Sequence, residues 1–418
     1  MVNKKIKNKK RENSNNSSDD FFVKSWIILA VGFITFGFLV FSTQLISPFI
    51  EPVGFSVSAM GANINVSFVS PTLSNNTQTY NNYLPIFINI TDSSNLDEFI
   101  FNWNGDNFTY YDDSLVLMLN FDNVSALGEN SSHFVDVSSY SNNGSTSSTN
   151  WVTSGKYGNS GFDCEADQGN YITFDDTPSL NISNTISISF WWKPDDRSSS
   201  IWRSIVAKRQ DNLPMVSQFG INYNYGTNAF QLYFYDEDFQ IISIPPNTYF
   251  SESKWYYVSG VMFNEGSDVN MSLYVDGVLI NSTVKSDKNI QTNNASVTVC
   301  TFFLDGSTPT EYGDGIIDEL RIWNRSLSSS EIEQVYLSNL NKFSSDSWSF
   351  YINETDLTIG NTYNYSGYVI DASSNSDDTG IRINILASAQ GVPEFSDYAL
   401  MLILVIVGGC IYKRRSFV

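Results

Sequence analysis

Residues 314–336 read DGIIDELRIWNRSLSSSEIEQVY, a stretch whose two halves follow different periods. In the first half, apolar side chains such as Ile316 and Ile322 recur at even positions, which is the pattern of one face of a β-strand. In the second half, Ser328 and Glu331 have the spacing of a capping box before an apolar helical repeat. The stretch therefore predicts a strand followed by a short helix.

Alternation with a period of two recurs on both sides of this stretch, whereas no second convincing helix is found there. Asp276-Gly277 lies between two alternating runs and predicts a tight hairpin. We therefore expect an all-β fold built from sandwiches. The alternating faces include Ile64, Val66 and Phe68; Leu84, Ile86, Ile88 and Ile90; Ile186, Ile188, Phe190 and Trp192; Phe230, Leu232 and Phe234; Met271, Leu273 and Val275; Trp348, Phe350 and Ile352; and Ile381, Ile383 and Ile385.

The composition of the 418 residues excludes several classes of function. The formal net charge of −21 argues against nucleic-acid binding through phosphate neutralisation. His133 is the single histidine, so histidine-ligated zinc and Ser-His-Asp catalysis are not expected. The composition is typical of an exported binding or structural protein, and we do not expect an enzyme.

Both ends of the chain predict a membrane anchor. Residues 25–50 lack charges and are long enough to cross a bilayer after a basic tail at 1–24, although a cleaved signal peptide is the alternative. Residues 398–412 are apolar and are followed by the basic end 413–418. By the positive-inside rule both basic flanks are cytoplasmic, which places 51–397 outside the cell membrane.

A linker at 387–397 contains Val392-Pro393-Glu394-Phe395 just before the second span. Together with the apolar and basic tail, this motif resembles archaeal C-terminal sorting signals of the PEF type. The resemblance implies recognition of the tail by a membrane transpeptidase, and an ordinary single-span anchor is the alternative. Fourteen Asn-X-Ser/Thr sequons lie between the two spans and agree with an exterior location and a glycoprotein.

The strands before and after the centre of the chain are too few to form two separate sandwiches. Residues 53–113 predict three or four strands and residues 343–386 about three more. Together they have the size of one immunoglobulin-like sandwich, whose opening and closing strands they resemble. We therefore expect a discontinuous sandwich interrupted by residues 114–342, with two unrelated small β-modules as the alternative.

The insert at 114–342 resembles laminin-G-like, concanavalin A-type jelly rolls over nearly its whole length. The motifs that carry the resemblance are LVLMLNFDN (115–123), DVSSYSNNGS (136–145), GFDCEADQGNYITF (161–174), ISISFWWKP (186–194), WYYVSGVMF (255–263), LYVDGVLINS (273–282) and the stretch at 314–336. The resemblance implies a jelly roll whose termini are close together, which suits an inserted domain.

The candidate metal ligands are Asp136, Asn142 and Asp318. By alternation, Asp318 shares a face with apolar neighbours, where an unpaired carboxylate is costly. The loop at 136–145 offers only oxygen ligands, which suit Ca²⁺, and the resemblance brings this loop beside the strand of Asp318. The alternative is that Asp136 forms a turn and Asp318 accepts backbone N–H groups.

Binding is a better prediction than catalysis for this fold. The paired carboxylates of concanavalin-like glycosidases, Glu-x-Asp-x-x-Glu, are absent. Aromatic rings that could stack on sugars are frequent, although each of them is also a candidate for the core. The possible ligand contacts are Trp191, Trp202, Tyr223 and Tyr225.

The sequence thus predicts a membrane-anchored surface protein that binds extracellular glycans or proteins. A passive envelope component is the main alternative, and a glycan hydrolase is a third. Cys164 and Cys300 both lie in predicted exterior strands, where they could form a disulfide or remain buried thiols.

Overall fold

The computed structural model describes residues 64–91, 95–146, 148, 150–195, 202–211, 215–244 and 250–388. Within these ranges, none of the helices has the length and apolar character needed to cross a membrane. The two predicted spans, both basic ends and the Val392-Pro393-Glu394-Phe395 motif lie outside the described residues.

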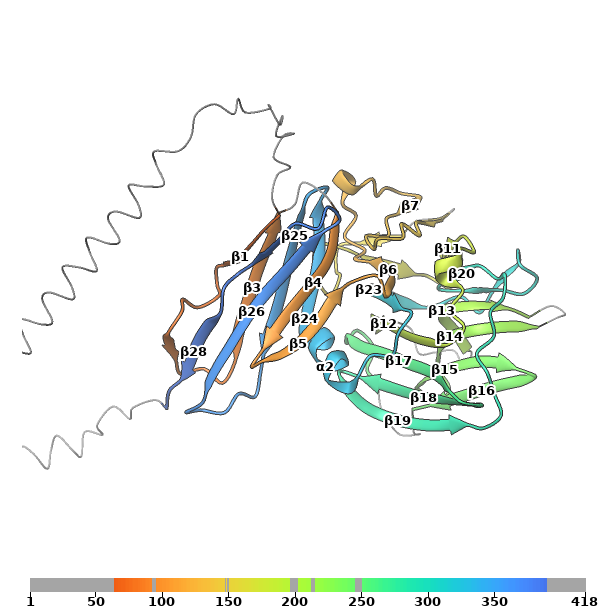
Figure 1. The fold of residues 1–418 in the computed structure, drawn as a ribbon. Coiled ribbons are helices and arrows are strands. Elements are labelled where there is room, and N and C mark those ends of the chain that lie inside the picture. The colour runs from red at the N-terminus through yellow and green to blue at the C-terminus, as the bar shows by residue number, and fades with distance from the viewer. Residues whose placement is uncertain are drawn as a thin grey trace, which may run out of the picture. The chain divides into compact units, whose positions relative to one another are not determined.

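Strands dominate the described chain (Figure 1). The first group is β1 (Asn65–Val69), β2 (Thr77–Thr79), β3 (Leu84–Thr91), β4 (Leu96–Trp103) and β5 (Asp106–Tyr111). The last group is β24 (Ser338–Ser344), β25 (Ser347–Glu354), β26 (Thr362–Asp371), β27 (Ser376–Asp378) and β28 (Arg382–Leu386).

In the described residues between these two groups there are eighteen strands and three helices. The strands are β6 (Leu115–Leu119), β7 (His133–Phe134), β8 (Gly144–Ser145), β9 (Trp151–Val152), β10 (Gly161–Cys164), β11 (Ile172–Phe174), β12 (Thr185–Pro194), β13 (Trp202–Gln210), β14 (Val216–Asn224), β15 (Ala229–Asp236), β16 (Asp238–Ser243), β17 (Tyr256–Glu265), β18 (Asp268–Val275), β19 (Val278–Lys285), β20 (Val297–Val299), β21 (Phe302–Phe303), β22 (Pro309–Thr310) and β23 (Gly315–Trp323). The helices are η1 (Ser125–Leu127), η2 (Pro178–Leu180) and α2 (Ser329–Leu337).

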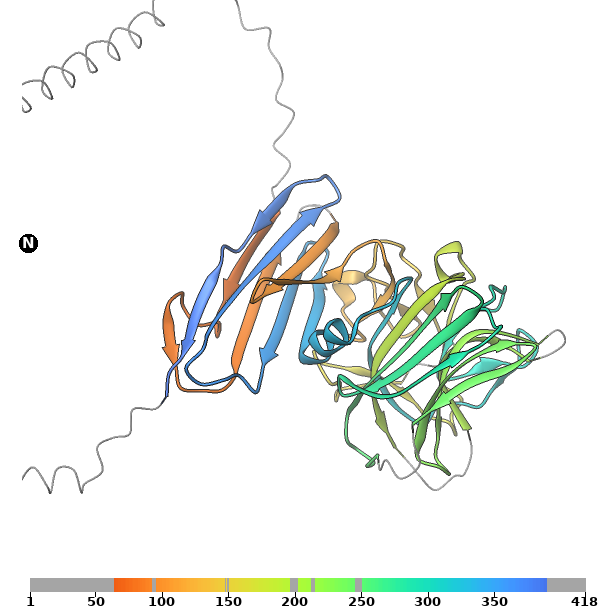
Figure 2. The same cartoon turned by 60° about the horizontal axis from the view of Figure 1, so that its bottom comes forward.

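The first and last groups of strands pair with each other. One sheet has the order β1-β3-β25-β24, and a second has β2-β28-β26-β4-β5 with β27 beside β26. Orange strands from the N-terminal part accordingly run beside blue strands from the C-terminal part (Figures 1 and 2). Ile86, Ile88 and Phe350 are buried between these sheets, which we call the discontinuous sandwich.

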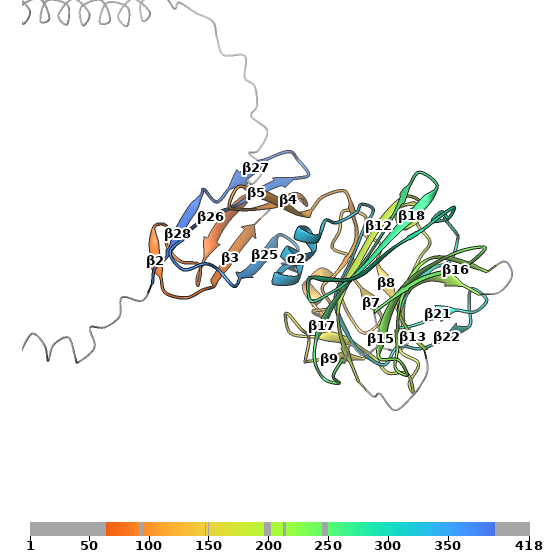
Figure 3. The same ribbon diagram turned by 90° about the horizontal axis from the view of Figure 1, so that it is seen from below.

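The strands between them form the two sheets of a jelly roll, which appear as separate layers in Figure 3. One sheet has the order β19-β18-β17-β12-β23-β10-β9, with β6 beside β23. The other has the order β16-β15-β14-β13-β20-β11-β8-β7, with β21 beside β13 and β22 beside β21. Alternate residues of both sheets, such as Phe190, Leu232 and Met271, fill the core between them.

Two local sequence signals have the predicted structures. Asp276 and Gly277 both have positive φ, at 50° and 79°, as a two-residue hairpin between β18 and β19 requires. Ser328 caps α2, because its Oγ accepts from the Glu331 N–H and the Glu331 carboxylate accepts from the Ser328 N–H. The helix ends at Leu337, where the backbone becomes extended.

Two expectations about individual strands are corrected by the structure. Strand β24 starts at Ser338, inside the predicted insert, and pairs with β25 of the discontinuous sandwich. In β28 the buried positions are Asn384 and Leu386, while Ile381 is 65% exposed. Asn384 is held inside because its amide donates to the Ser74 carbonyl at 2.9 Å and its oxygen accepts from a tyrosine hydroxyl.

Candidate functional site

The candidate binding site is a hollow on the outer face of the β13–β16 region of the jelly roll. Strand alternation creates this face, because Phe230, Leu232 and Phe234 point into the core and leave Gln231 and Tyr233 on the opposite side. The hollow has a volume of about 210 Å³. It is lined by Trp202, Arg209, Asn222, Gln231, Tyr233, Phe239, Ile241 and Glu311.

Aromatic rings and one guanidinium form the walls of the hollow. Tyr233 and Phe239 meet edge to face, with ring centroids 5.7 Å apart. Arg209 lies over the Phe239 ring at 4.8 Å from the centroid and over Phe302 at 3.8 Å. Asp211 binds Arg209 through two hydrogen bonds of 2.6 Å, which fixes the plane of the guanidinium.

Polar atoms in the hollow are available for a ligand. Among the described residues, Asn222 Oδ1 and Glu311 Oε2 are buried without a hydrogen-bond partner. Burial raises the pKa of Glu311, with Arg209 acting in the opposite direction. Gln231 donates to Ser243 Oγ at 2.7 Å. Since buried polar atoms normally find a partner, the unpartnered pair indicates a place where a bound molecule or water is accommodated.

This arrangement suits recognition better than chemistry. Apolar ring faces beside a few converging polar groups are typical of small-molecule sites. The volume is below the roughly 300–1,000 Å³ of a site for a drug-sized molecule, so it fits one ring or the end of a chain. A larger open hollow of about 770 Å³ is lined mainly by Asn, Ser and Thr, with Tyr140 as its aromatic residue.

Of the four aromatic residues predicted to contact a ligand, Trp202 lies in the hollow and is partly exposed. Trp191 is only 4% exposed and packs against Tyr257 and Tyr336, with ring centroids 5.4 and 5.6 Å away. Tyr223 and Tyr225 belong to the jelly-roll core, which corrects their assignment as ligand contacts.

Asp136 and Asn142 hold the 136–145 loop together through protein hydrogen bonds. Oδ1 of Asp136 accepts from the N–H groups of Met118 and Ser138, and Oδ2 accepts from Ser138 Oγ and the Asn142 N–H at 2.7 Å. Burial raises the pKa of Asp136, and these hydrogen bonds partly offset the rise. The Asn142 amide donates to the Val116 carbonyl at 2.7 Å.

Asp318 does not share a face with Leu320 and Ile322, contrary to the alternation in the sequence. The strand has a bulge here, because Glu319 adopts a φ of 52° and the register with β12 shifts. As a result Asp318 is opposite Trp191, while Ile317, rather than Ile316, is in the core.

In this position Asp318 is fully buried and accepts three backbone N–H groups, from Lys156 at 2.7 Å, Tyr157 at 3.1 Å and Glu319 at 3.0 Å. Glu319 pairs with Arg321 at 3.0 Å. Burial raises the pKa of both carboxyl groups, which also repel each other. Neither side chain lines the 210 Å³ hollow.

The expected calcium shell stays a prediction. Asp136 and Asp318 both accept hydrogen bonds from protein donors, so their carboxylates have partners without a cation. In the described part of the chain, no group of three or more His, Cys, Asp or Glu side chains is placed to hold a metal ion. The hydrogen bonding favours the alternative interpretation, in which both residues accept N–H groups.

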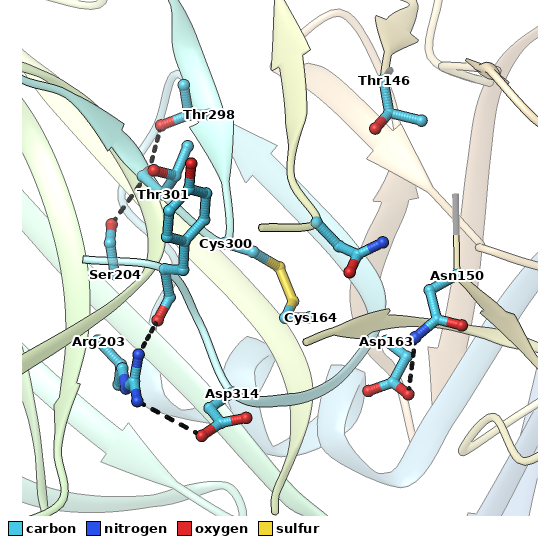
Figure 4. The surroundings of a disulfide bond; sticks show 12 residues. Thr146, Asn150, Asp163, Cys164, Arg203, Ser204, Thr298, Cys300, Thr301 and Asp314 are labelled. Atoms are coloured by element: carbon cyan, nitrogen blue, oxygen red, sulfur yellow. Dashed lines mark hydrogen bonds and ion pairs between the residues drawn. A yellow bond between two sulfur atoms is a disulfide. The ribbon is translucent and has the colours of Figure 1, made fainter. Parts of the chain in front are cut away.

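A disulfide links the two sheets of the jelly roll (Figure 4). Cys164 ends β10 and Cys300 follows β20, and their Cα atoms are 5.7 Å apart. Each sheet contributes one cysteine, so the bond joins opposite faces of the core. The pairing considered from the sequence is thus present in the structure.

Most residues of the hollow were not singled out from the sequence. The alternation in β15 contains a usable signal, since Gln231 and Tyr233 occupy the positions opposite the predicted core face. Arg209 and Glu311 carry no such signal, because they come from distant segments that meet only in the folded sheet.

The family comparison agrees with the jelly-roll assignment. Residues 166–333 match the laminin G family model, described as the concanavalin A-like lectin/glucanases superfamily. This segment is therefore similar to the jelly rolls of that superfamily. No curated protein matches the sequence.

Solved structures give distant matches. The binding domain of Paraclostridial Mosquitocidal Protein 1 matches with a TM-score of 0.41 and 17% identity, over 62% of this chain and 64% of that chain. Domain 4 of AbnA, an extracellular arabinanase from Geobacillus stearothermophilus solved with arabinotriose, matches with a TM-score of 0.39 and 18% identity, over 53% of this chain and 97% of that chain. The botulinum neurotoxin serotype D binding domain matches with a TM-score of 0.41 and 20% identity, over 54% of this chain and 51% of that chain. The matched regions thus span under two thirds of the two toxin chains.

Proposed function

We propose that the protein binds a saccharide on the outer face of the β13–β16 region of its jelly roll. The observation that carries this proposal is the hollow itself, where aromatic rings lie beside the unpartnered oxygens of Asn222 and Glu311. Sugar hydroxyls can donate to both oxygens, and the C–H face of a sugar ring can pack on the partly exposed Trp202.

A glycan array probed with the purified full-length chain tests the proposal. We expect Trp202→Ala and Asn222→Ala to weaken binding by about tenfold or more, corresponding to ~1.4 kcal/mol. Tyr80→Ala is the matched control, because Tyr80 is 61% exposed and belongs to the discontinuous sandwich. Equal binding by all three variants would place the ligand elsewhere. The 770 Å³ hollow would then be the next candidate site.

The same assay separates the alternative functions. No glycan bound above background would favour a passive envelope component or a protein ligand. Release of reducing sugars from a bound polysaccharide would identify a hydrolase.

The proposed location is the cell surface, with the chain anchored through 25–50 and 398–412 and the tail recognised by a sorting transpeptidase. The sequence features at both ends and the cross-sheet disulfide support this location. Mass spectrometry of the mature termini tests the anchors, and protease treatment of intact cells tests the exposure of 51–397. Resistance in intact cells but not in lysed cells would contradict it.

A further inference from the structure

The fourteen sequon asparagines all lie in the described part of the chain, and none of them is buried. Eight are exposed and six are partly exposed. The exposed ones are Asn65, Asn75, Asn107, Asn123, Asn130, Asn143, Asn294 and Asn324, and the partly exposed ones are Asn89, Asn181, Asn270, Asn281, Asn353 and Asn364.

Buried asparagines behave differently. Seven asparagines are buried in the described residues, and none of the seven is followed by the X-Ser/Thr of a sequon. They are Asn120, Asn142, Asn170, Asn222, Asn224, Asn339 and Asn384. In a strand, residues i and i+2 share a face, so the Ser or Thr of a sequon favours an accessible asparagine. All fourteen sequon asparagines are therefore open to modification in the folded chain.

One long stretch of the jelly roll carries no sequon. Between Asn65 and Asn364, successive sequons are at most 38 residues apart, except that 89 residues separate Asn181 from Asn270. The stretch between these two contains seven asparagines, none of them in a sequon. It forms strands β12 to β17, including the four strands that surround the 210 Å³ hollow.

From these two observations we infer that the chain carries N-linked glycans over its accessible surface and that the face around the hollow is kept free of them. The second half of this inference rests on the proposed function, because a bare face is needed where a ligand docks. A glycan on that face would cover an opening only large enough for one ring.

Asn281 is a sequon asparagine that contacts β16, the edge strand of this face. Its amide nitrogen donates to the Ser243 carbonyl at 2.8 Å, at the end of β16. The nitrogen that would carry a glycan therefore lies at the edge of the sheet, so a glycan here would lie beside the bare face. We expect little or no glycan at Asn281, in contrast to exposed sites such as Asn65 and Asn294.

Glycopeptide mass spectrometry of the chain purified from its native cells tests the first half. The expected map has glycans on most exposed sequons and little at Asn281. Unmodified asparagine at all fourteen sites, or full occupancy at Asn281, would overturn the inference. This measurement needs no ligand, so it remains decisive even if the proposed saccharide binding fails.

One substitution tests the second half, because Ile241→Asn creates the sequon Asn-Ile-Ser at the rim of the hollow. Ile241 is 38% exposed, so the new site is accessible. Phe343→Asn creates Asn-Ser-Ser at a residue that is 43% exposed on β24 of the discontinuous sandwich. Ile241→Gln changes the same side chain as the test variant without adding a sequon.

We expect both new sequons to be glycosylated, with glycan-array binding reduced about tenfold or more by Ile241→Asn alone. Phe343→Asn should bind like the unaltered chain, and Ile241→Gln measures the effect of losing the isoleucine side chain alone. Unchanged binding by glycosylated Ile241→Asn would overturn the assignment of a protected face. Loss of binding in Ile241→Gln as well would assign the effect to the lost side chain and count against a role for the glycan.

Discussion

The Nε2 atom of Gln334 on α2 lies 2.8 Å from Oε1 of Glu354 on β25. Both side chains are buried, and Gln334 Oε1 finds no donor within the described ranges. A protonated Glu354 would supply this donor, because its hydroxyl can face the amide oxygen. Burial raises the pKa of Glu354 to about 7, which agrees with a proton held at this position.

The pair predicts a pH-dependent stability. Because the pKa of Glu354 in the folded chain is above its ordinary value of 4.5, the folded state binds the proton more tightly than the unfolded state. The contribution of the bound proton on Glu354 to the free energy of unfolding is therefore complete below about pH 4.5 and is lost as the pH rises to about 7. Glu354→Gln removes this titrating group. The change in the free energy of unfolding caused by the substitution should therefore be about 1–3 kcal/mol more stabilising at pH 8 than at pH 4.5.

Urea denaturation at both pH values measures this difference. Glu265→Gln, at an exposed carboxylate, serves as the control and should change stability equally at the two pH values. An effect of Glu354→Gln that does not depend on pH would show that Glu354 is ionised in the folded chain.

The Cys164–Cys300 disulfide should contribute strongly to stability, because it closes a loop of 136 residues. We expect Cys164→Ala/Cys300→Ala to lower the free energy of unfolding by about 2–5 kcal/mol. Thermal denaturation with and without a reductant provides the measurement. The reductant should lower the Tm of the unaltered chain and leave that of the double variant unchanged; equal sensitivity of both would contradict a structural role for the bond.

The cap of α2 gives a smaller effect that can be predicted directly. Ser328→Ala removes the acceptor for the Glu331 N–H and should cost about 1 kcal/mol. Ser329→Ala is the matched control, since Ser329 is exposed in the first turn but does not cap the helix. Chemical denaturation of both variants measures the difference, and similar losses would show that the capping box is not the source.

Sequence alternation predicts the faces of regular strands well, because each side chain in such a strand points opposite to the one before it. Leu84, Ile86, Ile88 and Ile90 are all buried as expected, and so are Phe230, Leu232 and Phe234. In these strands the burial of one face dominates the energetics, so apolar residues occupy alternate positions in the sequence.

The alternation fails where a tertiary contact overrides it. In β28 the buried position belongs to Asn384, whose hydrogen bonds to the distant Ser74 and Thr77 carbonyls compensate for the burial of an amide. In β23 one extra residue at Glu319 reverses the faces, and a single strand gives no sign of the partner that requires it. The candidate site was missed for a related reason, since Arg209 and Glu311 meet only after the sheet forms.

The bulge at Glu319 also fixes the contacts of Asp318, and these contacts predict how the chain responds to calcium. Asp318 accepts three backbone N–H groups, so it needs no cation to compensate for its burial. We expect the Tm to be unchanged by EDTA and by excess calcium. Asp318→Asn should lower the free energy of unfolding by about 1–3 kcal/mol, because an amide cannot accept all three N–H groups. Asp167→Asn, at an exposed carboxylate, is the control for removing a carboxylate. A saturable rise of Tm with calcium that Asp318→Asn abolishes would instead establish the metal site expected from the sequence.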